Sequence, residues 1–142
     1  MKTSAKVLIV TLACAILAFF LGPVIWTPSP EAQPAPGLLP FYIVLSVVES
    51  VAFGLGVSFL LFGWPWVKKV NAPSKNLAVL TYLSISWMLI NWWPHDRLHI
   101  HNAMNMQGLL YIEYGFHFTL IVAAVIVARY FLLSLKKTGK LK

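Results

Sequence analysis

Three of the four histidines in this 142-residue chain lie within one short run, and the fourth follows a glutamate. The run reads His-x3-His-x-His and contains His95, His99 and His101. His117 lies four residues after Glu113, so the two side chains share a face if the segment is helical. Imidazole and carboxylate groups together suit zinc, copper or iron. We therefore predict a metal site that draws its ligands from these five residues.

Two methionines favour copper among these metals. Met104 and Met106 closely follow the histidine run, and thioether sulfur is a soft ligand that prefers Cu(I). Iron and zinc are alternatives. A b-type haem is a third, less favoured alternative, because it requires two inward-facing histidines on different helices and only His117 lies well inside an apolar segment.

Further polar residues lie in or next to apolar segments, where they are expensive unless they face the protein interior. We expect Glu49 and Asn91 to face inward together with Glu113 and His117, either as groups that support the ligands or as part of a proton path. Asp96 lies beside His95 and is expected to orient an imidazole as a supporting group.

The composition is that of an integral membrane protein. Hydrophobic residues make up 59% of the chain and charged residues 11%, with a mean hydropathy of +0.77. A soluble domain carries about a quarter charged residues. The net charge is +7, but the basic residues lie where membrane topology requires them, so we expect a lipid bilayer and no nucleic acid as partner.

Four apolar segments approach the ~20 residues that a spanning helix needs. They cover about 7–26, 39–62, 77–93 and 108–135, and the third is bounded by Pro94. The predicted fold is all-α, a single domain over 1–142 that forms a four-helix transmembrane bundle. A stripe of small residues in the second segment should allow close helix packing; it consists of Ser46, Ser50, Gly54 and Ser58.

The distribution of lysine and arginine predicts the orientation. Both terminal segments and the second connection are rich in lysine, whereas the first connection has no basic residue and the third has only Arg97. Both termini should therefore be cytoplasmic and the histidine run extracytoplasmic. We interpret the first segment as an uncleaved span, because its apolar stretch is longer than that of a signal peptide.

The favoured function is a metal-binding subunit of a larger membrane redox complex, such as a membrane monooxygenase or oxidase, or of a homo-oligomer. We expect the chain to be a non-catalytic or accessory subunit rather than a complete enzyme, because little of it lies outside the membrane. One alternative is a stand-alone metal-dependent oxidoreductase, and another is a structural subunit without metal. The histidine-box pattern of membrane desaturases is not met, because the chain has one His-x3-His and no His-x2-His-His.

Overall fold

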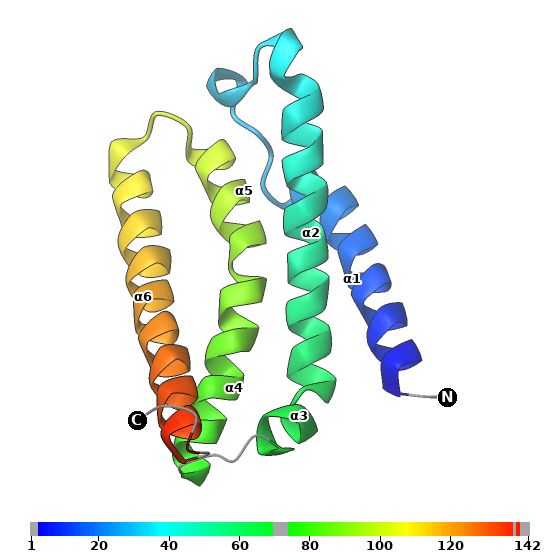
Figure 1. The fold of residues 1–142 in the computed structure, drawn as a ribbon. Coiled ribbons are helices and arrows are strands. Elements are labelled where there is room, and N and C mark those ends of the chain that lie inside the picture. The colour runs from blue at the N-terminus through cyan, green and yellow to red at the C-terminus, as the bar shows by residue number, and fades with distance from the viewer. Residues whose placement is uncertain (1–2, 70–73, 138, 140–142) are drawn as a thin grey trace.

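The computed structural model describes residues 3–69, 74–137 and 139, and every regular element within them is a helix (Figure 1). The elements are α1 (Thr3–Ile25), η1 (Pro30–Ala32), η2 (Pro36–Leu38), α2 (Leu39–Phe62), α3 (Trp64–Lys69), α4 (Lys75–Ile90), α5 (Trp92–Asn102) and α6 (Met106–Lys137). The all-α prediction is thereby confirmed for the described residues.

Three helical segments among the described residues are long and apolar enough to cross a bilayer. They are α1, α2 together with the short η2 before it, and α6. Helix α4 has only 16 residues, which is short of a full span, although α5 continues it in the same general direction (Figure 1). The membrane character of the chain is therefore supported, and the fourth span stays a prediction.

The third apolar segment does not end at Pro94 as the sequence suggests. Helix α4 ends at Ile90, and α5 begins at Trp92 after a break at Asn91. Proline has no N–H group, so the carbonyl of Ile90 lacks its usual donor four residues later. The next hydrogen bond along the helix is formed, because the His95 N–H donates to the Asn91 carbonyl at 3.1 Å. The break is therefore local, and the histidine run belongs to a helix.

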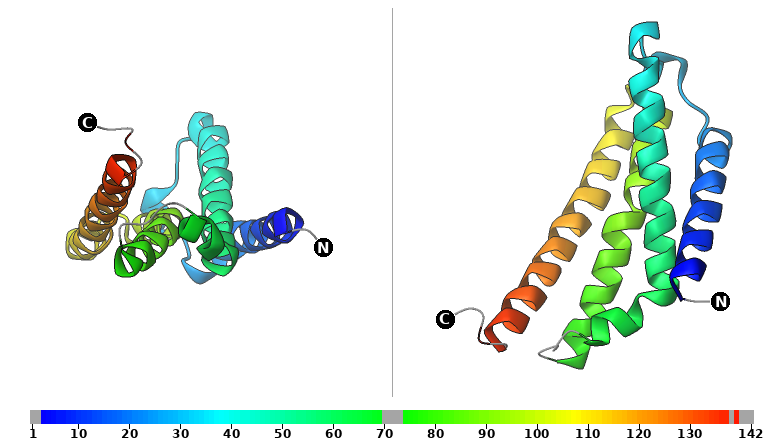
Figure 2. Two further views of the ribbon diagram at one scale, coloured as in Figure 1. Left: turned by 60° about the horizontal axis from the view of Figure 1, so that its bottom comes forward. Right: turned by 45° about the vertical axis from the view of Figure 1, so that its right-hand side comes forward.

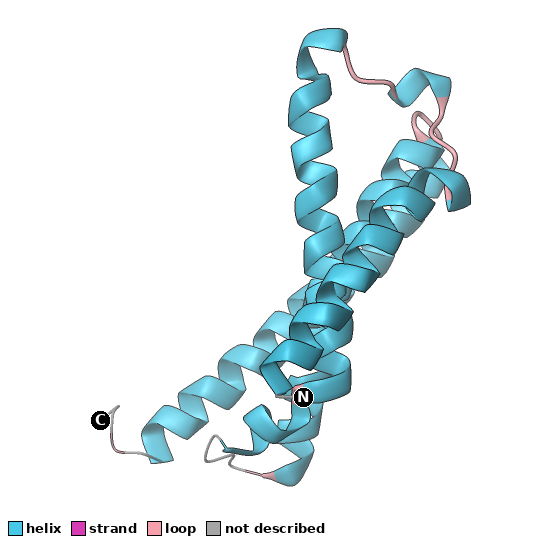
Figure 3. Ribbon diagram, turned by 90° about the vertical axis from the view of Figure 1, so that its right-hand side faces the viewer, coloured by secondary structure: helices cyan, strands magenta, loops and turns pink. Residues whose placement is uncertain are grey.

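The helices pack in a row (Figure 2). Helix α1 packs on α2, α2 on α4, and α4 on α6, while α5 contacts both α2 and α6. The beginning of α1, helix α3 and the end of α6 lie at one end, and the α5–α6 connection lies at the other (Figure 1). A view from the side shows the upper part of α2 standing apart from the other helices (Figure 3).

Small side chains form the helix contacts, and large apolar side chains face outward. Ser50, Gly54 and Ser58 of the small-residue stripe are buried, whereas Phe20 is 68% exposed and Val24 is 72% exposed. The hydroxyls of Thr11 and Ser58 form a 2.8 Å hydrogen bond between α1 and α2. This pattern is the reverse of that in a water-soluble core and fits helices surrounded by lipid.

Candidate metal centre

A tight reversal places the first turns of α6 beside α5. Ala103 ends α5 with a positive φ of 45°, and the Asn105 side chain then accepts a hydrogen bond from the Gly108 N–H at 3.1 Å. Helix α6 consequently runs back along α5, and the two helices are in contact. The shared face of His95 and His99 on α5 meets the shared face of Glu113 and His117 on α6.

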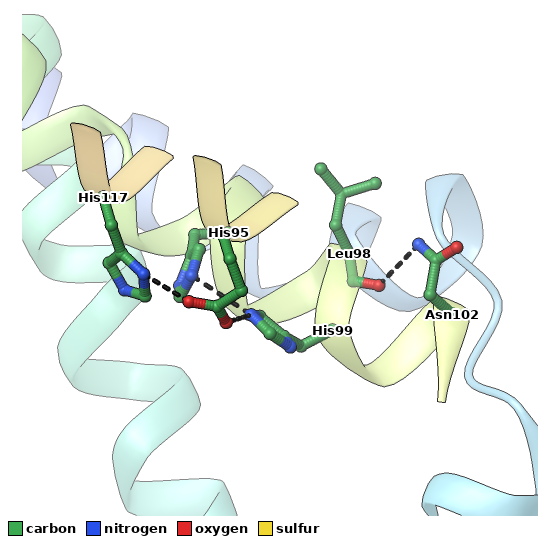
Figure 4. Close-up of polar contacts among 6 residues, drawn as sticks. His95, Leu98, His99, Asn102 and His117 are labelled. Carbon is green, nitrogen blue, oxygen red and sulfur yellow. Dashed lines mark hydrogen bonds and ion pairs between the residues drawn. The ribbon is translucent and has the colours of Figure 1, made fainter. Parts of the chain in front are cut away.

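These four side chains form one continuous polar cluster (Figure 4). The Nε2 atoms of His95 and His99 are 3.2 Å apart, and His99 Nε2 lies 2.9 Å from Glu113 Oε1. The second carboxylate oxygen, Glu113 Oε2, contacts Nδ1 of His117. The rings of His95 and His117 approach to 4.9 Å between centroids, which closes the cluster.

The spacing of the ligand atoms is close to that of a metal centre. One ligand atom each from His95, Glu113 and His117 lies within 4.8 Å of the other two. Bonds of about 2.0–2.1 Å at tetrahedral angles place neighbouring ligand atoms about 3.3 Å apart. The His95–His99 distance of 3.2 Å and the His99–Glu113 distance of 2.9 Å are close to this value, whereas the group of His95, Glu113 and His117 would have to contract around an ion.

The hydrogen bonds also leave nitrogen lone pairs available. Two neutral imidazole nitrogens at the 3.2 Å that separates His95 Nε2 from His99 Nε2 hold at most one proton between them, so at least one of the two presents a lone pair. Burial lowers the pKa of His95, and the adjacent His99 and His117 rings lower it further, which favours the neutral form that binds metal.

The cluster is only partly shielded from its surroundings. The side chains of His99, Glu113 and His117 are 30%, 42% and 47% exposed, so an ion can enter without a large rearrangement. One flank is aromatic, because the Phe116 ring lies 5.4 Å from the His95 ring.

Three predicted ligand or supporting residues that follow His99 in the chain do not join the cluster. His101 is two residues beyond His99 and points the other way, and its Nδ1 lies 2.8 Å from the Thr27 carbonyl oxygen in the first connection. Met104 and Met106 are largely exposed, at 74% and 67%, in and after the turn between α5 and α6. The cluster thus consists of nitrogen and oxygen atoms.

A second polar group lies on the α2 side of α5. Asp96 and Arg97 both interact electrostatically with the Glu49 carboxyl of α2, and Asp96 also interacts electrostatically with His95 of the cluster. Asn91 is fully buried at the helix break, and neither side-chain polar atom has a partner among the described residues. These residues surround the start of α5 without entering the cluster.

Arg97 is a buried residue of this region that the spacing of residues in the sequence does not mark as a candidate site residue. It is buried, at 6% exposed, and packs against Gly22 of α1. The available sequence signal is that Arg97 is the sole lysine or arginine between Lys75 and Arg129.

Comparison with known protein families, curated proteins and solved structures finds no match to this chain. Its function must therefore be inferred from the arrangement of its own residues.

Proposed function

We propose that this chain is a small integral membrane protein that binds one transition-metal ion through His95, His99, Glu113 and His117. The observation that carries the proposal is the convergence of two helical pairs, one from α5 and one from α6, on one small volume. Three imidazoles and a carboxylate match the preferences of copper, zinc and iron.

Copper remains the favoured ion, in its Cu(II) rather than its Cu(I) form. The ligand set contains nitrogen and oxygen, and divalent copper binds such sets more tightly than zinc or iron(II) does. A b-type haem fits less well, because the macrocycle must lie between its two axial imidazoles. The rings of His95 and His117, which come from different helices, are only 4.9 Å apart between centroids, which leaves no space for it.

The open row of helices supports a role inside a larger membrane assembly. Large apolar side chains cover the outward faces of α1, α2 and α6, where lipid or other spanning helices can pack. We therefore infer that the ion serves a redox complex, such as a monooxygenase or oxidase, with both termini cytoplasmic and the cluster extracytoplasmic.

A metal-free structural role is the alternative, and one observation favours it. Glu113 already contacts both His99 and His117, so its carboxylate ties α5 to α6 without an ion.

Titration of the purified chain with Cu(II), followed by electron paramagnetic resonance, distinguishes metal binding from the metal-free structural role. A bound ion with nitrogen hyperfine coupling is expected for the wild type and for His101→Ala, whose side chain lies outside the cluster. The coupling should be lost or altered in His117→Ala. Identical spectra for the wild type and His117→Ala, or a spectrum of free Cu(II) throughout, would leave the structural role as the better account. Parallel loading with zinc and iron tests the preference among metals.

A further inference from the structure

A buried arginine lies between three helices on the side of α5 that faces away from the metal cluster. Arg97 is 6% exposed, and its Nε atom has no hydrogen-bond partner within the described part of the chain. A charged side chain in an apolar surrounding is costly unless a counter-charge accompanies it. The Glu49 carboxyl interacts with Arg97 electrostatically, but no ion pair between described residues includes Arg97.

Helix α1 leaves space for this guanidinium. A methyl group at Gly22 would lie 2.8 Å from Arg97 Nε, which is closer than real contacts allow, and 3.2 Å from Cζ, which is tight. The absent side chain of Gly22 therefore forms a cradle in which the arginine is fixed against α1.

Arg97 lines a cavity between the outer halves of α1 and α2. The cavity has a volume of about 270 Å³, and its other walls are mainly apolar and aromatic, including Phe19, Phe20 and Ile43. A second cavity of about 200 Å³ shares Phe19 and Phe20 and extends along the same helix pair toward Leu12. No charged residue lines this second cavity. The two cavities thus form a groove that is cationic at one end and apolar along the rest.

We propose that this groove binds an anionic phospholipid, with its headgroup phosphate on Arg97 and one acyl chain along the α1–α2 groove. Guanidinium is planar and donates paired hydrogen bonds that match phosphate oxygens. The apolar continuation of the groove distinguishes an amphiphile from a free anion, because only an amphiphile fills both cavities.

The nearby carboxyl groups do not prevent this binding. Glu49 and Asp96 line neither cavity, whereas Arg97 lines the first, so a ligand in the groove meets the cation and not the carboxyl groups. Arg97 then remains the cationic group that lines the groove.

Native mass spectrometry of the full chain tests the proposal. The protein is released from vesicles of phosphatidylglycerol and phosphatidylcholine in equal amounts with identical acyl chains. Both lipids carry a phosphate, but the choline ammonium of phosphatidylcholine cancels the phosphate charge and is repelled by Arg97. The wild type should therefore retain the anionic lipid about tenfold more than the zwitterionic one. Arg97→Gln should retain the two lipids equally. The other arginine provides the matched control, since Arg129→Gln should behave as the wild type.

A second pair of variants tests the apolar part of the groove. Val47 and Val48 are both exposed residues of α2, but only Val47 lines the second cavity. Val47→Trp should reduce phosphatidylglycerol retention severalfold, and Val48→Trp should leave it unchanged.

Equal retention of both lipids by the wild type would overturn the proposal and leave Arg97 as the counter-charge of Glu49 and Asp96. Displacement of the lipid by inorganic phosphate at equal concentration would also overturn it, because a simple anion site would then suffice. If Arg97→Gln fails to fold, the wild-type lipid comparison and the Val47→Trp and Val48→Trp pair still decide the question. None of these outcomes depends on metal binding.

Discussion

The contact between α1 and α2 depends on the absence of a side chain at Gly54. A Cβ atom at this position would lie 2.3 Å from the Thr11 carbonyl oxygen and 3.1 Å from the Ala15 amide nitrogen. Both are backbone atoms, so no rotamer change can relieve the overlap. Ordinary van der Waals contact begins at 3.4 Å, and α1 would have to move outward by about 1 Å to reach it.

The substitution Gly54→Ala should therefore destabilise the protein by about 1–3 kcal/mol, the usual cost of overpacking. The matched control is Gly115→Ala in α6, where a Cβ atom meets nothing within 4 Å. That change should stabilise the helix by about 0.5–1 kcal/mol, because glycine is a poor residue inside a helix.

Reversible unfolding in mixed micelles, followed by circular dichroism, measures both effects. A cysteine pair across α1 and α2 in a Cys14→Ser background reports whether the two helices have separated. Equal unfolding free energies for Gly54→Ala and Gly115→Ala, with unchanged cross-linking, would refute the inferred close packing of α1 on α2.

Three further outcomes are expected. Tyr130→Phe should cost about 1–3 kcal/mol of unfolding free energy, because it removes the hydrogen bond that the buried hydroxyl donates to the Val67 carbonyl at 2.9 Å. Tyr114→Phe on an exposed face should cost nothing measurable, and equal costs for the two variants would contradict the importance of this bond. A membrane-impermeant maleimide should label Ser29→Cys, in the first connection, from outside intact cells. It should label Lys69→Cys, in the second connection, only after permeabilisation. Labelling of both from outside would contradict the predicted orientation. Metal occupancy should be constant above about pH 7 and fall as the pH drops below about 6, because protonated imidazoles cannot bind metal. The lowered pKa of His95 means that this ring is protonated only at a lower pH. Occupancy that rises on acidification would contradict histidine ligation.

Much of the helical framework is predictable from local sequence. The predicted segment 39–62 coincides with α2, and segment 108–135 lies within α6, because apolar length and flanking polar residues are local properties. The break at Asn91 is harder to place. A proline at position 94 affects the carbonyl four residues earlier, so the helix ends before the proline rather than at it.

The sequence predicts the two helical pairs of the cluster, but it does not predict that the two pairs meet. Spacing of four residues places His95 with His99 and Glu113 with His117, but their meeting depends on how α6 folds back on α5. The same helical geometry turns His101 away from His99 and toward Thr27, although proximity in sequence groups the three histidines together. Arg97 gains its significance from Gly22 and the α1–α2 groove, which are distant in sequence.

The central claim is tested most directly by elemental analysis of gently solubilised protein, with the wild type compared with His117→Ala and His101→Ala. We predict a single transition-metal ion per chain, with copper favoured, in the wild type and in His101→Ala, and loss of that ion in His117→Ala. Equal metal content in wild type and His117→Ala, or no metal in well-folded wild-type protein, would contradict the account and favour a purely structural cluster.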